Sequence, residues 1–242
     1  YPNLYISPIN LEKFNNLCGV VDVVYNPLNT SLVRKAKSLG IKAETGLYML
    51  VAQAVKASEI FLDVKYSTET IDNVYRKILI PKKNIILVGM PSCGKSTVGE
   101  LISKKLNMPL WDSDKIIEEI CKMSISEIFK MQGENYFRDI ESEIIDELSS
   151  KNGIVLSTGG GAILRKENVF AMKQNGDIYF IDRPLEQLLP TEDRPLALTK
   201  DDIKKRFEER YDLYCSASDV RIEVNGDAKS VAEDIINVFL ER

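Results

Sequence analysis

The strongest chemical signal in the sequence is a glycine-bounded loop that ends in lysine and serine. Residues 89–96 read GMPSCGKS and fit the P-loop pattern G-x-x-x-x-G-K-[ST]. Backbone N–H groups of such a loop point at a phosphate, and the helix that follows adds the positive end of its dipole. We expect Lys95 to reach the β- and γ-phosphates of a nucleotide and the Ser96 hydroxyl to bind Mg²⁺. The plain alternative is a glycine turn, but an apolar strand precedes the loop and a helix follows it.

Two carboxylates follow the P-loop at a short distance. Asp112 and Asp114 come after the strand-like residues 109–111. Alternate residues at a strand end would place both carboxylates near the phosphate-binding loop. One would then support Mg²⁺ through water, and the other would face an acceptor hydroxyl. The alternative is a solvated turn or a helix N-cap.

Two arginines further along the chain could hold a substrate anion. Arg138 and Glu141 lie three residues apart on an expected helix and are therefore neighbours. A guanidinium held by a carboxylate can still present a fork to an anion. Taken alone, however, this pair reads as an exposed ion pair, which is common and contributes little. Arg210, four residues before Tyr214 on a charged helix, taken alone reads as a solvated residue.

Two loops complete the set of residues that could do chemistry. Residues 159–161 are three consecutive glycines after an expected strand, and they would let backbone N–H donors approach a ligand closely. A flexible loop is the alternative. Residues 190–196 form a polar, proline-bounded segment that contains Arg194. Such a segment suits a lid that carries positive charge to a transferring phosphoryl group, although an ordinary surface loop fits as well.

The elements that must position these residues alternate in the manner of an α/β sheet. We expect strands at 85–88, 154–156, 178–181 and 220–224. We expect helices at 97–106, 112–121, 134–148, 201–214 and 231–240, and a capping box at 124–127 that opens a further helix. Parallel strands with helices on both faces account for this pattern.

The front of the chain reads as a separate, smaller α/β segment. We expect a strand at 20–24, a helix at 31–39, a strand at 41–44 and a strongly apolar, buried helix at 47–62, with a further helix after it. Residues 78–84, with Pro81, form the junction. The sequence thus predicts domains at 1–80 and 81–242, and the first is too short for more than a marginal core.

Composition excludes several classes of function. The chain of 242 residues contains no histidine, which removes histidine triads, histidine metal ligands and histidine general bases. A net charge of −4 argues against nucleic-acid binding. No apolar run is long enough to span a membrane. The four cysteines are dispersed, which is typical of reduced thiols in a cytoplasmic protein.

Taken together, these motifs resemble shikimate kinase over residues 82–242. The resemblance rests on residues 89–96, 112–114, 137–141, 159–161, 194–196 and 210–214, in the order of that family. It implies a nucleoside-monophosphate-kinase-like fold and transfer of the γ-phosphoryl group of ATP to the 3-hydroxyl of shikimate, with Mg²⁺ as cofactor. Alternatives are a kinase of gluconate or of a nucleoside monophosphate, or a nucleotide-binding scaffold without catalysis.

The resemblance also implies roles for individual residues. The catalytic residues would be Lys95, Asp114 and Arg194. ATP would contact Gly89, Ser92, Cys93, Gly94, Lys95, Ser96, Thr97 and Arg194, and Mg²⁺ would contact Ser96 and Asp112. Shikimate would contact Asp114, Phe129, Phe137, Arg138, Glu141, Gly159, Gly160, Gly161 and Arg210. Within this set, Arg138 and Arg210 would clamp the carboxylate, and Glu141 would orient Arg138.

The front segment resembles the C-terminal part of shikimate dehydrogenase. The residues that carry this resemblance are 1–3, 22–27 with Thr30, and 46–54. In that family, the residue matching Gln53 contacts shikimate, and those matching Tyr25 and Gly46 lie near the nicotinamide. The substrate domain and the glycine-rich dinucleotide loop are missing. The resemblance therefore implies the kinase part of a dehydrogenase–kinase fusion, with the N-terminal dehydrogenase region as a possible partner.

Overall fold

The computed structural model describes residues 6–188 and 199–242. The chain folds into two compact units. The first comprises residues 1–83 with 173–175, and the second comprises residues 84–172 with 176–242.

The second unit is built on a five-stranded sheet in the order β4-β5-β3-β6-β7. Its strands are β3 (Asn84–Val88), β4 (Leu110–Asp112), β5 (Val155–Ser157), β6 (Gly176–Asp182) and β7 (Val220–Glu223). Every pair of neighbouring strands is parallel. All five residues of the central strand β3 are buried, as expected for a parallel strand covered on both faces. The carboxyl ends of the strands consequently meet at one edge of the sheet.

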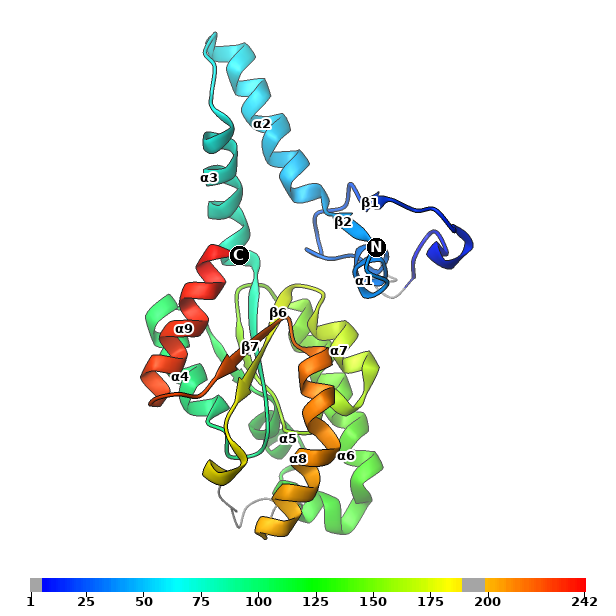
Figure 1. Ribbon diagram of the computed structural model, residues 1–242, viewed down its shortest axis with the longest axis vertical. Coiled ribbons are helices and arrows are strands. Elements are labelled where there is room, and N and C mark those ends of the chain that lie inside the picture. Colours follow the sequence, from blue (N-terminus) through cyan, green and yellow to red (C-terminus); the bar gives the residue numbers. More distant parts are fainter. Residues whose placement is uncertain (1–5, 189–198) are drawn as a thin grey trace. The chain divides into compact units, whose positions relative to one another are not determined.

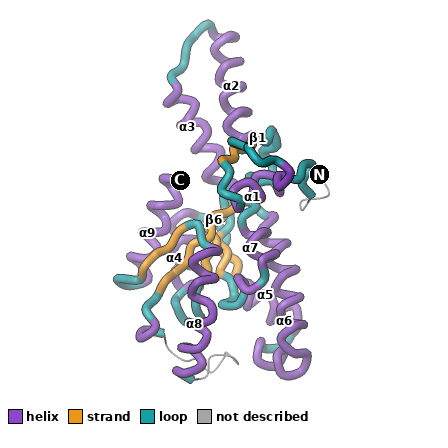
Figure 2. Tube along the Cα trace, turned by 45° about the vertical axis from the view of Figure 1, so that its right-hand side comes forward, coloured by secondary structure: helices purple, strands orange, loops and turns teal. Residues whose placement is uncertain are grey.

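Helices cover both faces of this sheet (Figure 1). They are α4 (Lys95–Leu106), α5 (Ser113–Cys121), α6 (Ile125–Ser150), α7 (Lys166–Met172), α8 (Lys200–Ala217) and α9 (Ala228–Glu241). Helices α4 and α9 pack together on one face, and α6, α7 and α8 lie on the other (Figure 1). Figure 2 shows the strands as an inner layer between helices. The predicted α/β architecture is therefore confirmed for this unit.

Two helices of the second unit differ from the prediction. The expected helix at 134–148 is the second part of α6, which is interrupted at Gly133 with φ 85° and ψ 168°. Ser124 opens α6 with the predicted capping box, in which the Ser124 side chain accepts from the Glu127 N–H and the Glu127 side chain accepts from the Ser124 N–H. Helix α7 was not predicted, because its seven residues are too few for a clear helical period.

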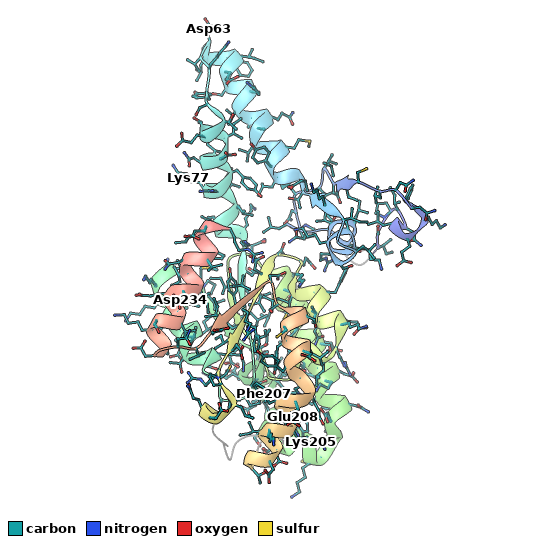
Figure 3. The ribbon with its side chains drawn as sticks, in the orientation of Figure 1. Asp63, Lys77, Lys205, Phe207, Glu208 and Asp234 are labelled. Carbon is teal, nitrogen blue, oxygen red and sulfur yellow. The ribbon has the colours of Figure 1, made fainter. Side chains whose placement is uncertain are left out.

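Over residues 6–83, the first unit contains a small parallel pair of strands and three helices. Its elements are β1 (Gly19–Val21), α1 (Ser31–Ser38), β2 (Lys42–Glu44), α2 (Gly46–Leu62) and α3 (Thr68–Leu79), with 3₁₀ turns at Leu11–Lys13 and Ile80–Lys82. The element order matches the prediction, although β1 is shorter than the expected strand at 20–24. Helices α2 and α3 form an antiparallel hairpin, and Figure 3 marks Asp63 at its tip.

The expectation that the apolar helix at 47–62 is buried was wrong. Leu47, Val51 and Val55 of α2 are buried, but Ile60 is 81% exposed and Phe61 is 86% exposed. The reason is that α2 packs along one side against α3, and the two short strands of this unit are too small to cover the remaining face. Apolar composition gave the helix correctly but could not show what would pack against it.

Among the described residues, none of the helices combines the length and the apolar character that a transmembrane segment requires.

Candidate active site

The loop after β3 has the tight backbone that its sequence pattern predicts. Gly89 and Gly94 have φ angles of 151° and 103°, and Ser92 also has a positive φ of 64°. A Cβ atom at Gly89 would lie 2.8 Å from both the Cys93 Sγ and the Ile181 carbonyl oxygen, so no larger residue fits there. Gly94 then serves as the N-cap of α4. The loop therefore folds closely over the positive end of that helix.

Lys95, the first residue of α4, is held inside the loop. Its Nζ donates to the carbonyl oxygens of Gly89 (2.9 Å) and Met90 (3.0 Å), and the side chain is buried. Both acceptors are neutral. Neither carbonyl oxygen is an ion-pair partner for the ammonium group, so an anion that enters the loop could replace them.

Asp112 connects the P-loop to the next strand end. The Ser96 hydroxyl donates to its Oδ2 at 2.8 Å. Its Oδ1 accepts from the backbone N–H groups of Asp114 (3.1 Å) and Lys115 (3.4 Å), which makes it the N-cap of α5. The N-cap interpretation of Asp112 is thus confirmed, and its second oxygen reaches the P-loop, while its role in supporting Mg²⁺ stays a prediction. Ser96 and Asp112 together present oxygen donors of the kind that Mg²⁺ prefers.

A cavity of about 510 Å³ lies between these residues. It is lined by Ser92, Gly94, Lys95, Ser96, Thr97, Asp112, Asp114, Lys115, Glu118, Ile125, Ser157 and Thr158. The sequence pattern placed Asp114 at the end of a strand and also within the expected helix at 112–121. The structure has it in the first turn of α5. Asp112 and Asp114 nevertheless face the same cavity as the P-loop.

Arg138 and Glu141 form a buried ion pair, so the interpretation of this pair as a surface feature was wrong. The guanidinium donates from Nη1 to the Glu141 Oε2 at 2.7 Å and from Nη2 to the Glu134 Oε1 at 3.1 Å. The Arg138 side chain is 8% exposed and that of Glu141 is fully buried. The guanidinium also lies 5.1 Å from the ring centroid of Phe137 and 6.0 Å from that of Phe129. These contacts fix the orientation of Arg138 from several sides.

Glu141 is in an unusual electrostatic position. Burial raises the pKa of its carboxyl group, while the charge of Arg138 acts to lower it and the charge of Asp114 to raise it. Its Oε1 is buried and has no hydrogen-bond partner among the described residues. This oxygen and the Asp114 Oδ1 both border Gly159, because a Cβ atom there would lie 2.7 Å from the first and 2.5 Å from the second. A hydroxyl placed there could donate its one proton to the Glu141 Oε1.

The three glycines at 159–161 form a buried junction rather than a flexible loop. A Cβ atom at Gly161 would overlap the Arg138 guanidinium, and one at Gly160 would lie 2.9 Å from the Pro91 ring. The Gly159 N–H donates to the Ser113 hydroxyl at 3.0 Å. The absence of side chains at these positions lets the arginine, the P-loop and α5 approach one another.

Arg210 is also buried, which corrects its interpretation as a solvated residue. Its Nη1 donates to the Gly160 carbonyl oxygen at 3.1 Å, and the Tyr214 hydroxyl donates to the same oxygen. Tyr214 in turn stacks on Phe180 of β6, with 5.0 Å between the ring centroids. Tertiary packing therefore draws this part of the charged helix α8 to the glycine junction, close to Arg138.

Arg183 is among the residues at the site that the sequence did not single out. Arg183 follows β6 directly, and its Nε donates to the Cys93 carbonyl oxygen of the P-loop at 3.1 Å. The available signal was its place after a buried strand, at the same sheet edge as the P-loop. Arg194 and the rest of the expected lid lie outside the described residues, so their role stays a prediction.

Comparisons with known proteins identify relatives of the second unit. The family model described as "Shikimate kinase" matches residues 91–240, more than half of the chain. The shikimate kinase of Clostridium botulinum (strain Alaska E43) is 43% identical over 163 residues, which are 66% of this chain and 98% of that protein. The shikimate kinase of Aquifex aeolicus is 39% identical over 157 residues, 63% of this chain and 93% of that protein.

Solved structures give the same result. A shikimate kinase from Acinetobacter baumannii in complex with shikimate has a TM-score of 0.64 and 32% identity, and the match covers 69% of this chain and 97% of that one. The structure from Aquifex aeolicus has a TM-score of 0.55 and 38% identity, over 64% of this chain and 94% of that one. These matches confirm the predicted P-loop kinase fold. With its P-loop, its carboxylates and its two buried arginines in one unit, the chain belongs to the shikimate kinase family.

Proposed function

We propose that this chain transfers the γ-phosphoryl group of ATP to the 3-hydroxyl of shikimate and so produces shikimate 3-phosphate and ADP. The observation that carries the proposal is the meeting of two buried arginines at a glycine junction beside the P-loop cavity. Buried arginines suit an acceptor with a carboxylate, because a planar guanidinium can bind both of its oxygens.

ATP would bind with its phosphates in the P-loop. The backbone N–H groups of residues 89–96 would contact the phosphates, and Lys95 would exchange its carbonyl partners for phosphate oxygens. The hydroxyl of Ser96 and the carboxylate of Asp112 fit a Mg²⁺ site, since this ion commonly takes one or two protein oxygens together with waters and substrate phosphates. Mg²⁺ bound there would offset the negative charge of the phosphates.

Shikimate would bind next to Asp114, on the side opposite to the ATP phosphates. Arg138 and Arg210 would hold its carboxylate, while Glu141 and Glu134 keep Arg138 in position. The junction at 159–161 would lie against the ring of the acceptor. Phe137 and Phe129 contact the Arg138 guanidinium, so we assign them mainly to support of that arginine.

The chemical step would occur between Asp114 and Lys95. The Asp114 carboxylate would orient the acceptor hydroxyl and take its proton as the new oxygen–phosphorus bond forms and the bond to ADP breaks. Lys95 would follow the charge of the transferring phosphoryl group. We assign a supporting positive charge to Arg194, which belongs to the expected lid.

A panel of acceptors tests this function. ADP release from ATP should be measured with shikimate, with gluconate and with nucleoside monophosphates. We expect turnover with shikimate, and nucleoside monophosphates at least about a hundredfold slower, because they lack a carboxylate for the two buried arginines. Gluconate has a carboxylate that the arginines could bind, so its rate relative to shikimate decides between these two acceptors. Faster turnover with gluconate or with a nucleotide would assign the chain to a different acceptor.

For the first unit, we propose that residues 1–80 are the C-terminal part of a shikimate-dehydrogenase-like domain and that the chain is the kinase part of a fusion. The support is a strand–helix–strand unit with parallel strands β1 and β2. In addition, a Cβ atom at Gly46 would overlap the Val23 backbone, so the close approach there requires glycine. The sequence of the full gene product upstream of Tyr1 tests this proposal directly.

A further inference from the structure

Arg183 links the end of strand β6 to the phosphate-binding loop. Its Nε donates to the Cys93 carbonyl oxygen at 3.1 Å, and its Nη1 donates to the Gln187 Oε1 at 3.2 Å. A Cβ atom at Gly94 would lie 3.7 Å from its Nη2, in ordinary contact. The side chain is half-buried. The planar guanidinium is thus held between the 3₁₀ turn Leu185–Gln187 and the P-loop.

The hydrogen bond to the Cys93 carbonyl also restrains the N–H group of the same peptide, which belongs to Gly94. The peptide bond between Cys93 and Gly94 is trans, so its C=O and N–H point in opposite directions. A donor that fixes the carbonyl of Cys93 therefore also fixes the direction of the Gly94 N–H. Gly94 lines the P-loop cavity, where phosphate would bind.

This peptide needs such a restraint. Gly94 has a φ of 103°, in a region that glycine adopts readily and other residues rarely adopt. Ser92, two residues earlier, also has a positive φ. A loop of this kind loses conformational freedom when its N–H groups converge on one anion, and a fixed carbonyl lowers that cost beforehand.

We propose that Arg183 is a positioning residue of the P-loop, which holds the Gly94 N–H toward the β-phosphate of the nucleotide through its hydrogen bond to the Cys93 carbonyl. The inference rests on the proposed binding of ATP in this loop. In this role, Arg183 neither contacts shikimate nor takes part in the proton transfer.

The test compares three variants by nucleotide titration. Arg183→Met keeps an unbranched stem as far as the position of Nε but removes the guanidinium and its donors, and Arg183→Lys restores one donor group and the charge. Arg242→Met is the matched control, because Arg242 also donates to a backbone carbonyl, that of Asp219, and pairs with Asp177 outside the cavity. Dissociation constants for MgATP, MgADP and AMP are measured together with the KM for shikimate.

We expect Arg183→Met to raise the dissociation constants of MgATP and MgADP by about tenfold each, the effect of one lost hydrogen bond. AMP binding and the KM for shikimate should stay within about twofold of wild type, since neither uses the β-phosphate contact. Arg183→Lys should recover nucleotide binding to within about threefold, and Arg242→Met should bind like wild type.

Three results would overturn the inference. The first is that Arg183→Met binds both MgATP and MgADP as tightly as wild type. The second is that Arg183→Met loses affinity for MgATP but not for MgADP. The third is that the KM for shikimate rises as much as the nucleotide dissociation constants, or that Arg242→Met loses as much nucleotide affinity as Arg183→Met. The second would indicate a direct contact with the γ-phosphate, and the third a general structural defect. A parallel Lys95→Ala variant keeps the two proposals apart. If Lys95→Ala is inactive while Arg183→Met binds normally, only this inference fails, whereas normal turnover of Lys95→Ala overturns the proposed function.

Discussion

Arg138 has its guanidinium donors divided between two carboxylates and its face against two aromatic rings. Such a group is oriented before a ligand arrives, so little entropy is lost when a carboxylate binds it. The proposed carboxylate contact would be made by a buried side chain, where a charge-assisted hydrogen bond is poorly replaced by solvent. The function of this residue therefore depends on its partners as much as on its own charge.

Arg138→Ala should raise the KM for shikimate by about ten- to a hundredfold, the range for a lost charge-assisted hydrogen bond. The KM for ATP should change by less than about threefold, because the P-loop contacts remain intact. Arg138→Lys should recover little, since an ammonium group lacks the planar fork. Steady-state kinetics with each substrate varied in turn provides the measurement. An equal rise for ATP and shikimate would show that the carboxylate-clamp role is wrong.

Asp114→Asn should lower kcat by about a hundredfold or more with a smaller effect on ATP affinity. The amide keeps the shape of the side chain and one acceptor, but it cannot take the proton of the acceptor hydroxyl. Presteady-state measurement of ADP formation, with ATP binding measured separately, separates the two effects. An unchanged kcat would place Asp114 outside the reaction centre.

At the scale of elements, the glycine junction at 159–161 connects α6, α8 and the P-loop. Gly161→Ala should displace the Arg138 guanidinium, because the added methyl group would overlap it. We expect a KM for shikimate raised by about tenfold or more, with ATP binding near wild type.

Gly133→Ala is the control for Gly161→Ala. Gly133 has a positive φ of 85°, but no heavy atom lies within 4 Å of its added Cβ. Its replacement should lower stability through backbone strain and leave the shikimate KM unchanged. If both variants change the KM equally, strain rather than displacement of Arg138 is responsible.

Parts of this site that depend on neighbouring residues in the chain could be predicted from the sequence, whereas parts that depend on tertiary contacts could not. The P-loop, the capping box at Ser124 and the spacing of Arg138 and Glu141 depend on neighbours in the chain, so their patterns are readable. The burial of Arg210 depends on Gly160, fifty residues away, and alone its helix reads as solvated. Only the resemblance to a family placed Arg210 in the site. Arg183 carried no motif, and nothing in its local sequence links it to Cys93.

At the scale of the whole molecule, the two units differ in how well they are packed. The central strand of the second unit is fully buried, whereas α2 of the first leaves Ile60 and Phe61 largely exposed. The two strands β1 and β2 also have free edges among the described residues, and a parallel pair of this size is not stable by itself. The apolar run at 47–62 could not reveal this from the sequence, because burial depends on the elements that surround a helix.

The first unit should therefore open before the second. Hydrogen exchange followed by mass spectrometry should show faster exchange over residues 1–80 than over the central strands β3 and β6. The chain should also form no NADPH from NADP⁺ and shikimate, since it lacks a glycine-rich dinucleotide turn in this unit. Strong protection throughout residues 1–80, or shikimate-dependent NADPH formation, would contradict these expectations.

We propose that one unit of this chain joins a P-loop to a site for a carboxylated acceptor. Phosphorus NMR of the products formed from ATP and shikimate tests it most directly, with wild type and Lys95→Ala measured side by side. We expect wild type to form ADP and a monoester at the 3-hydroxyl of shikimate in equal amounts. Lys95→Ala should be slower by at least about a hundredfold, because it loses the charge that follows the phosphoryl group. An absence of shikimate phosphate with wild type, or its formation at a normal rate by Lys95→Ala, would contradict the account.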